Sequence, residues 1–306
     1  MDLFVSMFAA TIIAATPLIF AALGELVVEK SGVLNLGIEG MMLIGAAFGI
    51  WVHFAGFPMI LAVGAAVVGG ALASLMFGVL ALTFMTNQYA AGLALAIFGA
   101  GVSAFIGRGF GTTPVEAIQP LHIPGLSDIP ILGEMFFQFD PLVYLSFVLF
   151  AAVSWFLYRT KAGLALRAIG ESPDSAHAIG YQVIRIRYLA VMFGGAMAGL
   201  GGAYLSLVYT PLWVENMTAG RGWIALALVV FAAWRPRRVI FGAWLFGGMT
   251  ILQLQGQAIG LTVPTEVLSA LPYVATIVVL VLISRNREAM ALDFPTSLAQ
   301  PFRPKG

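Results

Sequence analysis

The chain has 306 residues, of which 60% are hydrophobic and 9% are charged, with a formal net charge of +1 and a mean hydropathy of +0.98. Soluble domains carry about 25% charged residues, so this composition excludes a soluble globular protein. The chain has no cysteine, which excludes disulfides and thiolate metal sites, and its three histidines lack metal-ligand spacing. No Walker A pattern or catalytic constellation is present.

Continuous apolar runs follow one another along the chain and predict membrane-spanning helices. A helical span needs about 20 apolar residues, and the runs do not alternate as barrel strands would. The sequence therefore predicts an all-α, polytopic helical bundle with about nine spans, within limits of about eight and ten. We expect one transmembrane domain over residues 1–306, with runs at 3–23, 36–54, 58–83, 89–107, 142–158, 188–209, 239–257 and 267–284 and a shorter run at 222–234.

The segment 24–42, GELVVEKSGVLNLGIEGMM, places acidic, basic and amide residues among glycines. This pattern predicts a broken or re-entrant backbone rather than a smooth helix. We expect Glu29 and Lys30 to lie in a cytoplasmic turn. Glu39 begins the second run and would share a helical face with Asn35 if that turn is wound. Glu39 fits two roles, a polar group on a transport pathway or a partner for buried backbone groups.

Two features separate the next runs. Asn87 and Gln88 lie between the third and fourth runs, where a turn is expected, and Gly92, Gly99 and Gly101 predict close helix packing in the fourth run. The segment 108–141 carries four acidic residues against one arginine, and its five prolines exclude a long helix. The sequence predicts an irregular, acidic, extracytoplasmic loop there.

The segment 159–187 is the longest polar interruption of the chain, and its middle predicts a short exposed helix. Ser172 is a favourable N-cap, Pro173 fits the first helical position, and Asp174 faces the positive end of the helix dipole. Gly180 suits a left-handed stop. A helix of about two turns is marginally stable alone. The segment is therefore either an ordinary basic loop or a helix that docks into a soluble partner.

The distribution of basic residues predicts the orientation in the membrane. Of the fifteen lysines and arginines, five lie in 159–187, three in 235–238 and four in 285–305, which makes twelve. The positive-inside rule places these segments in the cytoplasm. The N-terminus is then extracytoplasmic, and the cytoplasmic tail, 285–306, is expected to end solvated and disordered. Arg221 precedes the short run and either faces an acidic outer partner or anchors the helix at the membrane interface.

Five segments, in order, resemble the permease subunits of ATP-binding-cassette importers of the branched-chain amino acid and ribose type, and within that group the nucleoside and simple-sugar branch. The resemblance covers about residues 12–284, and NLGIEGMM and GRGWIALA are its most specific parts. The segments are GELVVEKSGVLNLGIEGMMLIGA, NQYAAGLALAIFGAG, GLALRAIGESPDSAHAIGYQV, FGGAMAGLGGAYLSL and AGRGWIALALVVFAAWRP.

The resemblance implies a transport subunit without an enzymatic site, which carries a nucleoside or related sugar across the bacterial plasma membrane by alternating access. It implies cytoplasmic ATPase subunits, a second permease in a heterodimer and an extracytoplasmic substrate-binding protein as partners, and no nucleic acid. ATP and magnesium would be used by the partners, so no cofactor or metal is expected in this chain. The implied coupling helix comprises Ser172, Pro173, Asp174, Ser175, Ala176, His177, Ala178, Ile179 and Gly180.

Residues of the transport pathway are harder to assign, and the best polar candidates are Asn35, Glu39, Gln88 and Arg221. A rival interpretation is a self-contained secondary transporter or channel for a small polar solute. Such a protein usually carries an intramembrane acid or histidine relay, or half-helices in both halves. Only Glu39 is well placed for that role. A structural scaffold subunit would leave the 159–187 helix unexplained.

Overall fold

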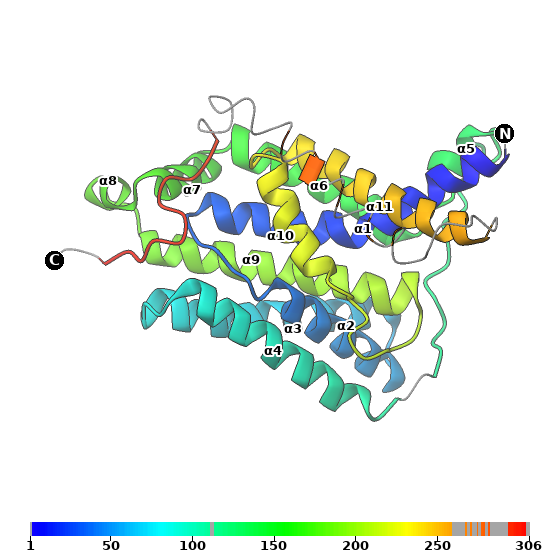
Figure 1. Ribbon diagram of the computed structural model, residues 1–306, viewed down its shortest axis with the longest axis horizontal. Helices are drawn as coiled ribbons and strands as arrows, with labels where there is room; N and C mark the ends of the chain where they lie inside the picture. The colour runs from blue at the N-terminus through cyan, green and yellow to red at the C-terminus, as the bar shows by residue number, and fades with distance from the viewer. Residues whose placement is uncertain are drawn as a thin grey trace.

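The computed structural model describes residues 2–110, 113–258 and 293–303, together with isolated positions between 267 and 281. These residues form helices and connecting segments without a strand, as predicted (Figure 1). The helices are α1 (Asp2–Lys30), α2 (Ile38–Phe54), α3 (Met59–Gly78), η1 (Val79–Thr83), α4 (Gln88–Gly107), α5 (Leu132–Phe136), α6 (Pro141–Arg159), α7 (Lys161–Glu171), α8 (Pro173–Ala178), α9 (Val183–Tyr204), η2 (Leu205–Tyr209), α10 (Arg221–Phe231) and α11 (Pro236–Ala258).

Five helical stretches are long and apolar enough to cross a membrane within the part of the chain that the structure describes. They are Phe4–Lys30, Met59–Thr83, Gln88–Gly107, Pro141–Arg159 and Val183–Tyr209, while α2 and α10 are shorter apolar helices. Each expected run from 3–23 to 239–257 coincides with one helix or with two continuous ones, although 36–54 and 58–83 begin slightly before their helices and 222–234 ends three residues after α10. The run at 267–284 lies mostly outside the described residues.

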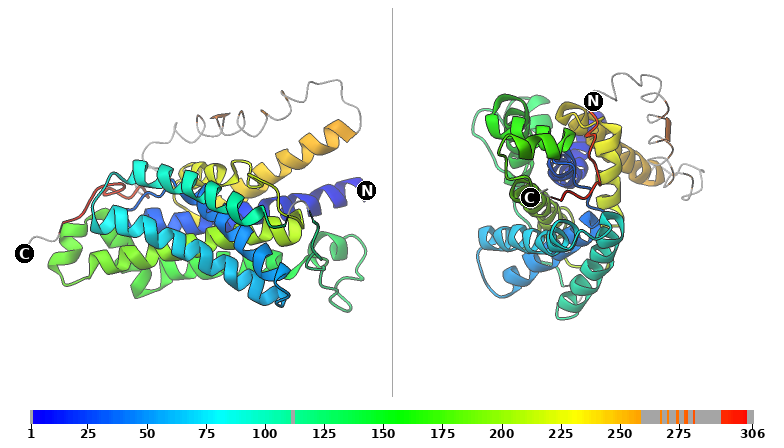
Figure 2. Two further views of the ribbon diagram at one scale, coloured as in Figure 1. Left: turned by 90° about the horizontal axis from the view of Figure 1, so that it is seen from below. Right: turned by 90° about the vertical axis from the view of Figure 1, so that its left-hand side faces the viewer.

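The bundle is built around α1 and α9, which lie at its centre in the end-on view (Figure 2). In the most apolar part of the α9–η2 stretch 78% of the residues are buried, against 28% in α6. Outer helices instead expose large apolar side chains, such as Ile97 in α4 and Trp155 in α6. This inversion of the soluble pattern suits a bundle surrounded by lipid.

Glycines let the central helices touch through their backbones. A Cβ added at Gly45 of α2 would lie 2.4 Å from the Cα of Gly199 in α9, and one added at Gly70 of α3 would lie 2.1 Å from the Gly195 carbonyl oxygen. Larger residues would separate these helices. In α4, Gly99 contacts the backbone of α2 as predicted, whereas the prediction for Gly101 is wrong because no atom of the described residues lies within 4 Å of its added Cβ.

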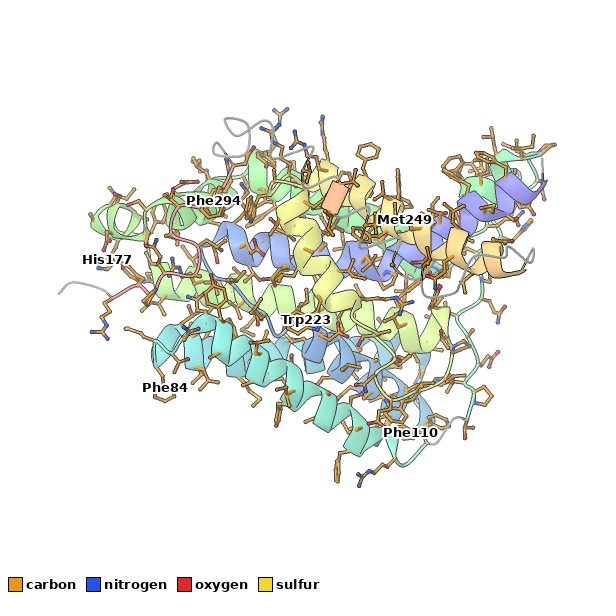
Figure 3. The ribbon with its side chains drawn as sticks, in the orientation of Figure 1. Phe84, Phe110, His177, Trp223, Met249 and Phe294 are labelled. Carbon is orange, nitrogen blue, oxygen red and sulfur yellow. The ribbon has the colours of Figure 1, made fainter. Side chains whose placement is uncertain are left out.

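The two ends of the bundle differ in structure. Phe84, His177 and Phe294 lie at one end, called here the α8 end, and Phe110 lies at the opposite, α5 end (Figure 3). At the α5 end the described part of segment 108–141 is irregular apart from the five-residue α5 and the start of α6. Asp140 caps α6 by accepting from the Leu142 and Val143 amides, and burial raises the pKa of its carboxyl group.

The structure at the α8 end corrects three expectations. Helix α1 continues through Glu29 and Lys30, which are buried in its last turns and do not form a turn. Helix α9 already begins at Val183, so Arg187 is a helical residue with 1% exposure and not part of a solvated loop. The described end of the tail, 293–303, is not a free solvated end, since it packs against the bundle with buried residues such as Phe302.

Candidate functional site

The segment 31–37 breaks the chain between α1 and α2, as the glycine-rich sequence predicts. Gly32 adopts a left-handed conformation with φ of 85°, and the following residues run back along the bundle, so that α2 begins partway along its length (Figure 1). Helix α10 lies across the long helices and begins beside the start of α2. The first turns of two short helices therefore meet inside the bundle, a contact called here the α2–α10 junction.

Glu39 holds the α2–α10 junction together. Its Oε1 accepts from the Thr218 hydroxyl at 2.6 Å and from the Gly220 amide at 2.8 Å, and its Oε2 accepts from the Gly222 amide at 2.6 Å. The carboxylate thus satisfies amides at the start of α10 and also lies at the positive end of that helix dipole. The backbone-satisfying role foreseen for Glu39 is present in the structure. A role on the transport pathway stays a prediction.

Gly222 shows why the junction requires a glycine. An added Cβ would lie 2.6 Å from both the amide nitrogen and the Cα of Glu39, so any side chain would push α10 away from α2. The segments NLGIEGMM and GRGWIALA, far apart in sequence, are thus brought into backbone contact. The sequence showed that both segments resemble the same family, but it did not show that they are in contact.

Asn35 and Gln88 support the turn that leads into α2. The Asn35 side chain accepts from the Gly37 amide at 2.8 Å, and Gln88 Oε1 accepts from the Leu34 amide at 2.9 Å. Asn35 lies before the first turn of α2, so it does not share a wound helical face with Glu39. Gln88 is 3% exposed, and its Nε2 has no hydrogen-bond partner among the described residues.

Arg221 follows Gly220 at the start of α10. Its Nη1 donates to the carbonyl oxygens of Met217 and Thr218 at 3.4 and 3.3 Å, and its guanidinium lies 5.5 Å from the centre of the Tyr209 ring. These contacts fold the side chain back over the loop before α10. Arg221 therefore lies near the junction but has no contact with Glu39 among those described.

Two buried acids escaped the sequence reasoning as site residues. Glu25 is 1% exposed and accepts from the Asn35 amide at 3.2 Å, and Glu29 is 0% exposed and accepts from the Trp234 indole at 2.5 Å. They link α1 to the 31–37 segment and to the turn after α10. Their spacing of four residues on one helical face was the available signal, since it marks a polar stripe within an apolar helix.

Helix α8 has the capping that the sequence predicts. The Ser172 hydroxyl accepts from the Ser175 amide at 3.3 Å, Pro173 is the first helical residue, and Gly180 follows with φ of 96°. Ala176 faces the bundle at 2% exposure, whereas Ile179 just after the helix is 74% exposed. The helix lies at one extreme of the molecule (Figure 1).

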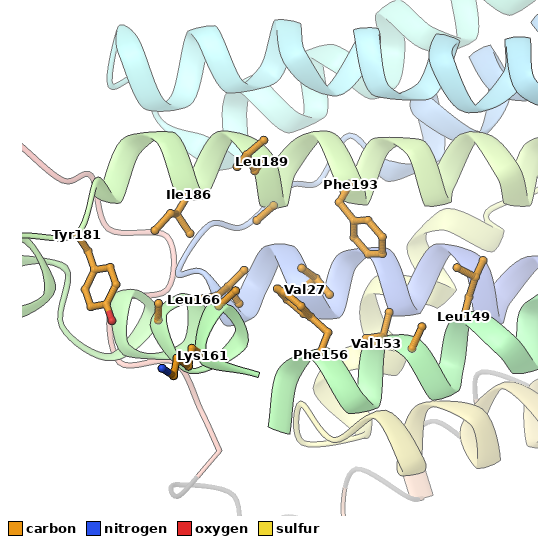
Figure 4. Close-up of a pocket in the computed structure, with 14 residues that line it drawn as sticks. Val27, Leu149, Val153, Phe156, Lys161, Leu166, Tyr181, Ile186, Leu189 and Phe193 are labelled. Atoms are coloured by element: carbon orange, nitrogen blue, oxygen red, sulfur yellow. The ribbon is translucent and has the colours of Figure 1, made fainter. Parts of the chain in front are cut away.

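A cavity of about 660 Å³ lies between α1, α6, α7 and α9 (Figure 4). Apolar side chains such as Val27, Phe156 and Phe193 form most of its wall, and the polar lining side chains are Lys161 and Tyr181. Such a wall offers a sugar or nucleoside few hydrogen-bond partners. None of the predicted pathway residues lines this cavity.

Comparisons with known proteins cover nearly the whole chain. The chain is 38% identical to the putative glucose ABC transporter permease protein TsgC13 of Haloferax volcanii, over 96% of each chain. It is 35% identical to the guanosine ABC transporter permease protein NupQ of Bacillus subtilis, over 89% of each chain. A second guanosine permease of that bacterium, NupP, is 25% identical over 84% of this chain and 76% of its own length.

The family model described as branched-chain amino acid transport system / permease component matches residues 7–281. Proteins of this family are transport subunits of the plasma membrane rather than enzymes, and they work with ATPase and substrate-binding partners. On this match and these relatives, the chain belongs to the family of branched-chain amino acid transport system permease components.

Proposed function

We propose that this permease subunit carries a nucleoside or a related sugar into the cell by alternating access. The observation that supports this substrate class is the similarity, over 89% or more of the chain, to a guanosine permease and a putative glucose permease. Guanosine contains a ribose, so a sugar ring is common to both named solutes. Transport would be driven by ATP and magnesium bound to the partner ATPases.

Helix α8 and its caps, Ser172 to Gly180, form the coupling helix in this proposal. Three properties support the role: α8 lies at one extreme of the bundle, its cap is local, and its outward side presents Ile179. A six-residue helix is unstable alone, but the packing of its own Ala176 against the bundle gives α8 a fixed position. Closure of the ATPases would move α8 and the attached helices as the bundle changes state.

The transport pathway passes beside the α2–α10 junction in this proposal. Asn35, Glu39, Gln88 and Arg221 all lie in or next to the segments that form the junction or the turn leading into it. The unpartnered Gln88 Nε2 is a donor available to a solute hydroxyl or base nitrogen. Broken helices that meet within the membrane are a common way to place polar groups at a transport site.

The subunit pairs with a different permease in this proposal. Bacillus subtilis has two guanosine permeases, and this chain covers 89% of one at 35% identity but 76% of the other at 25% identity. If two such unlike permeases work together, the partner of this chain would be a more distant relative that resembles the second one. A substrate-binding protein would deliver the solute at the opposite membrane face from the ATPases.

The α8 end is cytoplasmic in this proposal, and segment 108–141 is extracytoplasmic. Arg159, Arg185 and Arg235 lie at the α8 end in the helices and turns that begin or end there. The N-terminus lies at the α5 end and the C-terminus at the α8 end (Figure 1). An extracytoplasmic N-terminus and a cytoplasmic C-terminus follow.

Purification of the tagged chain from detergent-solubilised membranes of its own host tests this function. We expect an ATPase and a second, different permease to be recovered with it, identified by mass. Liposomes containing that complex should take up labelled guanosine or glucose only when ATP and the binding protein are present. Recovery of the chain alone, active for uptake without ATP, would overturn the proposal in favour of a secondary transporter.

A further inference from the structure

Residues 293–303, called here the C-terminal strap, cross the α8 end of the bundle. In Figure 1 the strap runs from the region above α7 and α6, past the ends of α1 and α9, toward the C-terminus. Figure 3 places Phe294 of the strap and His177 of α8 at this same end. The strap thus lies against elements that are widely separated in sequence, and its contacts form three groups.

The middle of the strap is held by Arg187 of α9, whose side chain is almost completely buried. Its Nε donates to the Ser31 carbonyl oxygen at 3.0 Å, its Nη1 to the Gln300 carbonyl oxygen at 3.2 Å, and its Nη2 to the Ser297 hydroxyl at 3.2 Å. All these acceptors are neutral oxygens. A buried charge is costly unless it is hydrogen-bonded, so Arg187 depends on the strap remaining in place.

Backbone contacts at the same point leave little freedom. The Ala299 amide donates to the Gly32 carbonyl oxygen at 3.1 Å, and the Ser297 amide donates to the Gly170 carbonyl oxygen at 2.9 Å. Ala299 has φ of 62°, a strained value for alanine that persists only where surrounding contacts fix it. A Cβ added at Gly32 would lie 2.5 Å from the Ser297 hydroxyl and 2.7 Å from Arg187 Nη2.

The first residues of the strap contact the turn between α10 and α11. The Asp293 carboxylate accepts from Arg235 Nε at 2.5 Å, and the Asp293 carbonyl oxygen accepts from Lys30 Nζ at 2.7 Å. The Phe294 ring packs edge-on against Trp234 with 5.0 Å between ring centres. Trp234 in turn donates to Glu29 of α1, so this end of the strap is joined to the helix that precedes the 31–37 segment.

The first strap residues contact the α10–α11 turn, and the last described strap residues contact helix α8. Phe302 is 7% exposed and packs in one apolar cluster with Ile169, Ala176 and Val183. Its ring centre lies 5.7 Å from that of His177. Phe302 therefore lies beneath α8, on the side that faces the bundle and away from the exposed Ile179.

We propose that the C-terminal strap links α8 mechanically to the α10–α11 turn, with Phe302 and Arg187 as its positioning residues. The proposal rests on the function assigned to α8 above. A displacement of α8 is passed through Phe302 to the strap, through Arg187 to the 31–37 segment, and through Asp293 and Phe294 to the end of α10. Loss of the strap contacts would then lower the amount of solute taken up per ATP hydrolysed, without releasing the ATPase.

Replacing Phe302 with alanine tests the link, because it removes the contact with α8 at a distance from the α2–α10 junction. The complex with ATPases and binding protein is reconstituted in liposomes, and uptake of labelled guanosine or glucose is divided by ATP hydrolysed. We expect this ratio to fall about tenfold, within the usual range of coupling between sites. The ATPases should still co-purify. Phe57→Ala, which removes a 52% exposed phenylalanine from the α2–α3 turn, is the matched control and should leave the ratio unchanged.

The outcomes separate the two proposals. A wild-type complex that hydrolyses ATP and takes up solute first establishes the function of the subunit. A Phe302→Ala complex with the wild-type ratio, even at reduced yield, then overturns the strap proposal alone, because the contact would only stabilise the fold. Ser297→Ala gives a second reading if Phe302→Ala folds poorly, since it removes one hydroxyl partner of Arg187, and the same fall in the ratio is expected.

A chemical clamp tests whether strap and α8 move together. The native chain has no cysteine, so His177→Cys with Phe302→Cys introduces a unique pair that a short, cleavable thiol crosslinker can join. Phe302→Cys removes the ring contact with α8, so we expect a low uptake ratio before crosslinking and recovery of the ratio once the crosslinker joins the strap to α8. A ratio that stays low in the crosslinked complex, or uptake that is lost on crosslinking and returns on cleavage, would overturn the proposal. Single-cysteine variants treated in the same way are the controls.

Discussion

Helices α8 and α10 are both short, and both begin with a capped first turn, but the caps come from different distances along the chain. Helix α8 is capped by Ser172, the residue directly before it. Helix α10 begins after Gly220, which has no side chain, and its amides are satisfied by Glu39 of α2. The first cap is formed within the α8 segment itself, whereas the second joins α10 to the interior of the bundle.

The difference explains what each helix is suited to do. A helix that is capped by its own segment keeps that capping hydrogen bond when neighbouring elements move. This suits an element that docks into a moving partner. A helix capped by a distant carboxylate exists in that form only while the two segments remain together. Substitutions should therefore act on α8 through partner binding and on α10 through folding.

The largest expected effect on uptake is at Ile179, just after α8. Ile179→Glu should lower uptake about thirtyfold or more, as loss of an interface hot spot of about 2 kcal/mol would. Ile179 is 74% exposed, so insertion and folding should be unchanged, and co-purification of the ATPase should weaken. Ile179→Val is the control. Normal uptake by Ile179→Glu would remove the basis for docking at this helix.

A side chain at Gly222 should break the α2–α10 junction. Gly222→Val places carbon atoms within the space of the Glu39 backbone and should destabilise the protein by about 3 kcal/mol. Thermal unfolding of the purified protein, followed by loss of monodisperse material, measures the effect. Gly101→Val is the matched control, since no atom lies within 4 Å of its added Cβ. Equal melting temperatures for both variants would show that the α2–α10 junction does not require a glycine at position 222.

Glu39→Gln keeps the shape of the side chain but replaces one acceptor oxygen by a donor. One of the Gly220 and Gly222 amides or the Thr218 hydroxyl then faces an NH₂ group, at a cost of about 2 kcal/mol. Glu116→Gln, on the exposed 108–141 segment, should have no effect. Uptake is measured per folded protein. A change in that quantity supports a pathway role, while reduced yield with unchanged specific uptake leaves only the structural role.

The smallest effect is expected at the local cap. Ser172→Ala removes the acceptor for the Ser175 amide and should cost about 1 kcal/mol, confined to α8. Hydrogen exchange should become faster in residues 173–178 while global unfolding stays the same. Ser172→Asp should restore protection because aspartate also caps. A fall in global stability would show that the Ser172 cap stabilises more of the protein than α8.

The contrast between the two caps also marks how far the sequence could predict the structure. The cap of α8 and the break at Gly32 depend on neighbouring residues, and both predictions are confirmed. Apolar runs likewise predict the described long helices, because a membrane span is set by local composition. The assignments of Ser172–Gly180 as the coupling helix and of Asn35, Glu39, Gln88 and Arg221 to the pathway stay predictions.

Errors arose where a residue acquires its role from distant contacts. Arg187 was placed in the cytoplasmic 159–187 segment with the other basic residues, yet it is buried by the strap and the 31–37 segment. Glu29 was expected in a turn, but its partner is an indole 205 residues away. The tail was expected to end solvated and disordered because chain ends are often poorly ordered. No local pattern carries this information, since each pairing depends on the closed fold.

The glycine contacts between α2, α3 and α9 restrict how this bundle changes shape. Side chains can absorb small shifts by changing rotamer, but Gly45 and Gly70 meet α9 through main-chain atoms, which have no such freedom. Sliding these helices would require pulling them apart and exposing polar backbone to lipid. We therefore expect the three helices to move together as one rigid body, with any hinges in the segments that connect this body to the rest of the subunit.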